Sequence, residues 1–164
     1  MRTMADNARD EEVALLKRAA ARTEGSGAAG GAADVAASVA PDLPAFEREI
    51  TLTAGGLELA GHLAIPDRAT GAVIFALASG SSRRSPRNRL VAAALNQAGL
   101  GTLLADLLTP EEELRRANVF DVWMLAARLT GITRWLCRHP VACGIPLGYF
   151  GASTGAAAAL WAAA

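Results

Sequence analysis

The chain has 164 residues, of which 52% are hydrophobic, so it has room for one domain with a sizeable core. Sixteen basic and sixteen acidic residues give a formal net charge of zero, which offers no global reason to expect nucleic acid or an anionic membrane as a partner. The two cysteines, Cys137 and Cys143, are too few for a disulfide framework, and with the nearby histidine they match no common zinc spacing.

The N-terminus does not resemble a signal peptide, because residues 5–18 are strongly charged and no uninterrupted apolar core follows them. The most apolar long stretch, residues 117–138, contains Asp121, Arg128 and Arg134, which favours a buried helix over a membrane span. These features predict a cytoplasmic protein.

Residues 1–43 differ in composition from the rest of the chain. Residues 10–22 carry a partial apolar stripe that fits a short helix, and residues 25–31 have the glycine-rich composition of a flexible linker. We predict a flexible tail over residues 1–43, with a small docking helix for a partner as the alternative. A single partial domain is expected over residues 44–164.

The pattern changes to alternating strands and helices from Phe46 onward. Residues 49–53 and 57–65 predict two strands joined by a turn at Ala54-Gly55-Gly56. The other expected elements, in chain order, are strand 72–77, helix 86–98, strand 101–106, a short helical turn at 109–110, helix 118–138, strand 145–150 and helix 154–164.

Strands that alternate with helices imply right-handed crossovers and a parallel sheet with helices on both faces. The predicted fold class is therefore α/β, an antiparallel hairpin followed by parallel strands. Trp123, Trp135 and Trp161 lie in predicted helices, and we expect them in the core.

The segment Gly151-Ala152-Ser153-Thr154-Gly155 follows a predicted buried strand and opens a predicted helix, which is the context that a G-x-S-x-G nucleophile elbow requires. Gly151 and Gly155 remove side chains where strand and helix approach closely. The helix N-terminus places its dipole beside the Ser153 hydroxyl, and the Thr154 N–H lies where an oxyanion would develop. We predict Ser153 as a nucleophile, with an ordinary serine in a glycine-rich turn as the alternative.

Three motifs occur in order: Ser79-Gly80-Ser81-Ser82 with Ser85-Pro86-Arg87-Asn88, Asp106-Leu107-Leu108-Thr109-Pro110-Glu111-Glu112, and Gly148-Tyr149-Phe150-Gly151-Ala152-Ser153-Thr154-Gly155. Together they make residues 46–164 resemble the N-terminal half of the dienelactone-hydrolase-like branch of the α/β-hydrolase superfamily. The resemblance implies a serine hydrolase that acts on small-molecule esters or lactones and needs no metal or cofactor. It also implies a triad in the chain order Ser, Asp, His and a second oxyanion N–H, which Ser79 would supply.

Two features depart from the family pattern. The family commonly has His-Gly where this sequence has Leu77-Ala78, which affects the loop that carries Ser79. The family's acid and base follow later strands, whereas the only histidines here are His62, in the second hairpin strand, and His139, before the last strand. A strand rises about 3.3 Å per residue, which puts His139 roughly 20 Å from Ser153. We expect neither histidine to act as the base.

Two hypotheses follow from these departures. In the first, the chain is a serine hydrolase truncated after the elbow, and the triad Asp and His are missing or come from another polypeptide. In the second, it is a catalytically inactive remnant, or half of a split protein that acts through a partner. The last strand would form an open sheet edge, which predicts a complementing chain or self-association. Nucleotide binding is disfavoured, because no G-x-G-x-x-G follows the first buried strand.

Charged residues cluster beside the predicted site. Arg83, Arg84 and Arg87 are candidates for binding a substrate carboxylate, and a solvated loop is the alternative. We interpret Asp106 as a residue that fixes a loop and not as the triad acid. Residues 111–113, all glutamates, are expected at a helix N-terminus, unless one of them pairs with the arginine loop.

Overall fold

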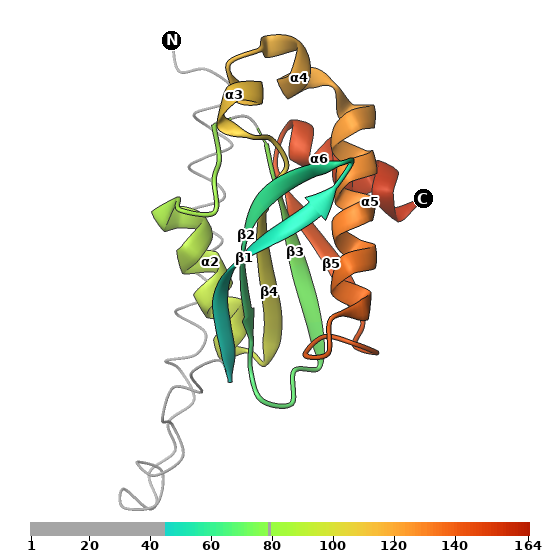
Figure 1. Cartoon of the computed structure of the whole chain (residues 1–164). Coiled ribbons are helices and arrows are strands. Elements are labelled where there is room, and N and C mark those ends of the chain that lie inside the picture. The colour runs from blue at the N-terminus through green and yellow to red at the C-terminus, as the bar shows by residue number, and fades with distance from the viewer. Residues whose placement is uncertain (1–44, 79) are drawn as a thin grey trace, which may run out of the picture. The chain divides into compact units, whose positions relative to one another are not determined.

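The computed structural model describes residues 45–78 and 80–164. These residues form a five-stranded sheet in the order β1-β2-β4-β3-β5, with helices on both faces (Figure 1). The predicted α/β fold class is confirmed. The expected tail over residues 1–43 and its short helix lie outside the described residues.

The first two strands form the predicted hairpin. Strands β1 (Phe46–Ala54) and β2 (Leu57–Ile65) pair antiparallel through a two-residue turn at Gly55 and Gly56. Both glycines have positive φ, 62° and 78°. A type I′ turn needs positive φ at both central residues, which glycine adopts without steric cost.

The other three strands build the parallel part of the sheet. Strand β3 (Gly71–Leu77) lies between β4 (Leu100–Asp106) and β5 (Leu147–Gly151) and runs parallel to both, while β4 also pairs antiparallel with β2. The register sets Ala76 beside Ala105 on one side and beside Gly151 on the other. The carboxyl ends of β3, β4 and β5 therefore meet at one edge of the sheet.

Five helices lie in the described residues, and none of them is long and apolar enough to cross a membrane. They are α2 (Pro86–Gln97), α3 (Pro110–Glu113), α4 (Arg116–Phe120), α5 (Val122–Arg138) and α6 (Thr154–Ala163). The prediction of one helix over residues 118–138 is wrong at Asp121. This residue has φ −79° and ψ 80°, and its carboxylate accepts a hydrogen bond of 3.0 Å from the Met124 N–H, so it caps α5.

Apolar side chains form a core on each face of the sheet. The larger core lies under α5 and α6, and the fully buried residues of α5 in it are Leu125, Leu129, Ile132 and Leu136. The smaller core lies under α2 and consists of Phe75, Leu77, Ala92 and Leu104. Burial on both faces explains why β3 and β4 are continuous apolar runs.

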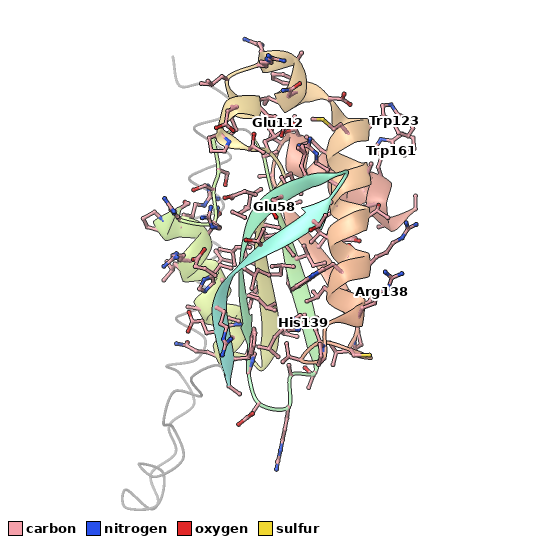
Figure 2. All side chains as sticks on the ribbon, viewed as in Figure 1. Glu58, Glu112, Trp123, Arg138, His139 and Trp161 are labelled. Atoms are coloured by element: carbon pink, nitrogen blue, oxygen red, sulfur yellow. The ribbon has the colours of Figure 1, made fainter. Side chains whose placement is uncertain are left out.

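The expectation that all three tryptophans lie in the core is wrong. Trp123 is 66% exposed and Trp161 is 52% exposed, and their rings contact each other at a centroid distance of 4.0 Å. Figure 2 shows both on the side of α5 that faces away from the sheet. Trp123 precedes buried Leu125 by two residues, which is about 200° of helix rotation, so it points to the opposite face. Trp135 is partly buried against the larger core.

Candidate active site

Ser153 lies on the turn between β5 and α6, at the carboxyl edge of the parallel strands. Its backbone has φ 53° and ψ −125°, a conformation that residues with a Cβ rarely adopt and that commonly marks functional turns. Ser153 is exposed, and its side chain makes no capping hydrogen bond to α6 although it occupies the N-cap position. The hydroxyl is therefore presented to solvent from a sharp strand-to-helix turn, as in a nucleophile elbow.

The two glycines of the motif allow β5 and α6 to pack closely. A Cβ at position 155 would lie 2.1 Å from the carbonyl oxygen of Ala76 in β3. A Cβ at position 151 would lie 2.8 Å from the carbonyl carbon of Gly155. Real Cβ atoms do not come this close to backbone, so the spacing Gly-x-Ser-x-Gly is a steric requirement of this turn.

The N-terminus of α6 leaves an N–H beside Ser153. The first hydrogen bonds of the helix run from the Gly155 and Ala156 N–H groups to the carbonyl of Ala152, at 3.0 and 3.4 Å. The Thr154 N–H has no such partner in the described part of the chain, as expected at a helix start. Thr154 itself is buried. Ser79, the other predicted oxyanion donor, lies outside the described residues.

His62 lies far across the sheet from Ser153. His62 pairs with Leu104 of β4, Leu104 pairs with Phe75 of β3, and Phe75 pairs with Phe150 of β5. Three strand spacings separate His62 from Phe150, which is roughly 14 Å. Its two ring nitrogens lie 3.0 Å from a Glu49 oxygen and 3.1 Å from a Glu47 oxygen. His62 is thus held by carboxylates of β1 and does not reach the elbow.

His139 lies near the amino ends of the parallel strands, whereas the elbow lies at their carboxyl ends. It is the C-cap residue of α5, and its ring packs against Trp135 at 4.8 Å and Phe46 at 5.6 Å. Figure 2 shows it at the end of α5 remote from Glu112, which lies near the carboxyl edge. Neither histidine of the chain is placed to take a proton from Ser153.

Arg83 and Asp106 interact directly. The Arg83 N–H donates to Asp106 Oδ1 at 2.8 Å, and Nη1 donates to Asp106 Oδ2 at 2.5 Å, while Nε donates to Glu49 at 2.9 Å. Burial by itself lowers the pKa of Arg83, but the hydrogen bonds that Arg83 donates to Glu49 and Asp106 outweigh this effect and raise that pKa. Asp106 thus holds the loop after β3, as its position at a strand end suggested. No sequence pattern indicates the contact with Glu49, which is 34 residues away from Arg83.

The other two candidate arginines are exposed. Arg84 lines a cavity of about 320 Å³ beside the ends of β2 and β4, together with Arg83, Asp106 and Glu113. Arg87 lies in the first turn of α2. Arg83 is therefore engaged by acidic side chains and partly buried, whereas Arg84 and Arg87 are exposed.

Glu112 pairs with Arg128 and not with the arginine loop. Arg128 Nη2 lies 2.6 Å from Glu112 Oε1, and Arg128 Nη1 also donates to the carbonyl of Leu107 at 2.8 Å. The Arg128 side chain is 6% exposed and that of Glu112 is 22% exposed. The hydrogen bond from Arg128 holds the pKa of Glu112 below its ordinary value of 4.5. This pair joins α3 to α5 and fixes the segment that follows β4.

The described residues contain no group of three or more His, Cys, Asp or Glu side chains that could hold a metal ion. The elbow itself presents a hydroxyl and the N-terminus of a helix.

No family model matches the chain. Proteins from two strains of Mycobacterium tuberculosis, CDC 1551 and H37Rv, are each 53% identical to it over 155 residues, and both are named "Putative phosphoribosyl transferase". The aligned part covers 94% of this chain but 33% of each relative. The chain thus spans about one third of the length of the curated relatives that it matches.

Solved structures show the same fold. Dienelactone hydrolase from Anabaena variabilis is 55% identical, with a TM-score of 0.68 over 72% of this chain and 56% of that chain. Est1E from Butyrivibrio proteoclasticus is 15% identical, with a TM-score of 0.57 over 70% of this chain and 44% of that chain, so it supports the fold alone. The described residues form part of an α/β-hydrolase fold, and the chain resembles the dienelactone-hydrolase branch of that superfamily, as its three motifs predicted.

Proposed function

We propose that this segment carries the nucleophile of a serine hydrolase that acts on carboxylic esters or lactones, and that Ser153 is this nucleophile. The observation that carries the proposal is the backbone of Ser153, which has φ 53° at an exposed turn between two sterically required glycines. The likeness to dienelactone hydrolase supports an ester or lactone as the substrate class.

In the proposed reaction the Ser153 oxygen attacks the carbonyl carbon of the substrate. The negative charge that develops on the carbonyl oxygen would be stabilised by the Thr154 N–H and the N-terminal dipole of α6. The backbone N–H of Ser79, in the loop after β3, is the second proposed donor. Arg84 and Arg87 are the proposed contacts for an anionic group on the substrate.

The general base of the reaction is proposed to come from outside this chain. A serine hydroxyl is a weak nucleophile without an adjacent base. The chain has two histidines, and His62 and His139 both lie far from Ser153. An additional polypeptide segment, or a complementing chain, would have to supply the acid and the base. The alternative is an inactive remnant or half of a split protein that acts through a partner.

The name of the mycobacterial relatives points to a different reaction, phosphoribosyl transfer. That name describes proteins of which this chain matches 33%, whereas the elbow geometry lies within the described residues of this chain. The hydrolase is therefore the function that the site itself supports.

Covalent labelling tests the nucleophile. The purified 164-residue chain is incubated with a fluorophosphonate, which phosphonylates reactive serines, and the modified residue is located by peptide mass spectrometry. We expect slow labelling at Ser153 and no labelling of Ser153→Ala. Labelling spread equally over other serines, such as Ser82, would contradict the assignment.

A further inference from the structure

The loop after β3, defined here as residues 80–85, is held from several sides. Asn88 of α2 donates through its side-chain amide to Ser81 Oγ at 2.9 Å and to the Ser82 carbonyl at 3.0 Å. Arg89 Nε donates to the Arg83 carbonyl at 3.2 Å, and Asp106 of β4 accepts from the Arg83 N–H. Both backbone polar groups of Arg83 are thus bound to side chains of neighbouring elements.

The guanidinium of Arg83 joins this loop to two strands. It contacts Asp106 at the end of β4 and Glu49 in β1. The side chains of Arg83 and Asp106 are 16% and 17% exposed, so this pair is shielded from solvent more than a typical surface ion pair. Glu49 is 53% exposed, and its contact with Arg83 is expected to be the weaker one.

Three positively charged or hydrogen-bonding side chains converge on Glu49. Besides Arg83, its carboxylate contacts Arg89 of α2 at 3.3 Å and His62 of β2 at 3.0 Å. Burial by itself raises the pKa of Glu49, but the hydrogen bonds from Arg83 and His62 outweigh this effect and lower the pKa below its ordinary value. The network therefore spans β1, β2, β4 and α2, and Arg83 connects it to the loop.

We propose that Asp106 and Glu49 are positioning residues that set the backbone of the loop that follows β3, and that they act through Arg83. The proposal rests on the proposed function, because residues 80–85 directly follow Ser79, whose backbone N–H is the second proposed oxyanion donor. Such a donor has to lie about 2.7–3.1 Å from the oxyanion, so a small displacement of the loop weakens it. Glu49 lies on β1, and three strands separate β1 from β5 in the sheet, so Glu49 can act only through other residues.

The test compares Asp106→Asn, Arg83→Gln and Glu49→Gln with a matched control, Glu47→Gln. Glu47 lies two residues from Glu49 on β1, has the same exposed fraction of 53% and also contacts His62. Among the described residues, the side chain of Glu47 pairs with His62 alone. The first readout is the rate of Ser153 labelling by a fluorophosphonate, measured where urea melts show that each variant is fully folded. The second is amide hydrogen exchange of residues 80–85.

We expect Asp106→Asn and Arg83→Gln to slow labelling about tenfold and to speed exchange in the loop. Glu49→Gln should cause a smaller change in the same direction, and Glu47→Gln should match the wild-type chain. A purely structural role would lower stability without slowing the labelling of folded protein. Faster loop exchange with an unchanged labelling rate would therefore overturn the positioning role.

The two proposals fail separately. If the wild-type chain is not labelled at Ser153, the proposed function fails. If loop exchange in Asp106→Asn and Arg83→Gln is the same as in Glu47→Gln, the network does not position the loop, whatever Ser153 does.

Discussion

The backbone of Ser153 is held in a conformation that suits glycine better than serine. A non-glycine residue at φ 53° and ψ −125° costs of the order of 1–3 kcal/mol. The Ser153 side chain makes no capping hydrogen bond that would offset this cost, so stability does not explain a serine at this position.

Replacement of Ser153 by glycine should relieve this strain. We expect Ser153→Gly to be more stable than Ser153→Ala by about 1 kcal/mol, because alanine keeps the Cβ and glycine loses it. Urea denaturation of the two variants measures the difference. Equal midpoints and equal slopes would show that the turn is not strained.

Gly155 is required by contact and not by its backbone angle. Because an alanine Cβ would lie 2.1 Å from the Ala76 carbonyl oxygen, Gly155→Ala should push α6 away from β3. We expect a loss of about 2 kcal/mol in the free energy of unfolding. Gly148→Ala is the control, since a Cβ there meets no atom within 4 Å. A change of less than 0.5 kcal/mol, on the order of a neutral surface substitution, at position 155 would contradict the packing described here.

At the residue scale, sequence could predict what depends on neighbours in the chain. The elbow is such a case, because its two glycines and its serine lie within five residues. The partner of Arg83 could not be predicted, because Glu49 reaches it only through the register of three strands. The pairing of Glu112 with Arg128 was missed for the same reason, since it depends on where α5 begins.

Among the elements, α3 and α5 are joined by the Glu112–Arg128 ion pair, and stability should depend on pH through it. The pKa of Glu112 is lowered in the folded chain. The stabilisation is therefore fully present above the unfolded value, near 4.5, and is lost as pH falls through the folded pKa.

We expect Glu112→Gln to cost about 3 kcal/mol at pH 7, because it leaves the buried Arg128 guanidinium without its counter-charge. The variant should also lose less stability than the wild-type chain between pH 6 and about pH 3. Thermal melts across this range measure both effects. Glu111→Gln is the control, since Glu111 is exposed in the same helical turn. An identical pH profile in the Glu112 variant and the wild-type chain would refute the assignment.

Element boundaries were predictable where a local signal marks them. Thr109 and Pro110 begin α3, and Gly99, with φ 78°, follows the end of α2. The break at Asp121 was not predicted, because the apolar pattern continues through it. Asp121 nevertheless caps α5 by accepting a hydrogen bond from the Met124 N–H. An aspartate inside an apolar helical pattern can therefore indicate that a new helix begins there.

For the molecule as a whole, β5 pairs with β3 on one side, and no strand among the described residues lies on its other side. An unpaired edge favours pairing with another chain. We expect the purified chain to self-associate with rising concentration.

Gly148→Lys should reduce the association, because it adds a charge to the unpaired strand β5. A Cβ at position 148 meets no atom within 4 Å, so the fold tolerates the side chain. Sedimentation measures the association, and Leu90→Lys, at an exposed site on α2, is the control. Equal effects of the two lysines would contradict pairing through β5.

The alternation of strands and helices was enough to predict the fold class, because parallel strands need crossover helices on both faces. The strand order could not be derived from it, since β4 lies between β2 and β3 only in the folded sheet. The remote positions of both histidines were predictable from the strand rise and the chain order.

Hydrolysis of p-nitrophenyl acetate by the purified 164-residue chain tests the central claim most directly. The claim is that Ser153 is a nucleophile whose general base does not belong to this chain. We predict negligible turnover, with the same rate for the wild-type chain and Ser153→Ala. Robust hydrolysis that is lost in Ser153→Ala would contradict it, because a base within these 164 residues would then activate the serine.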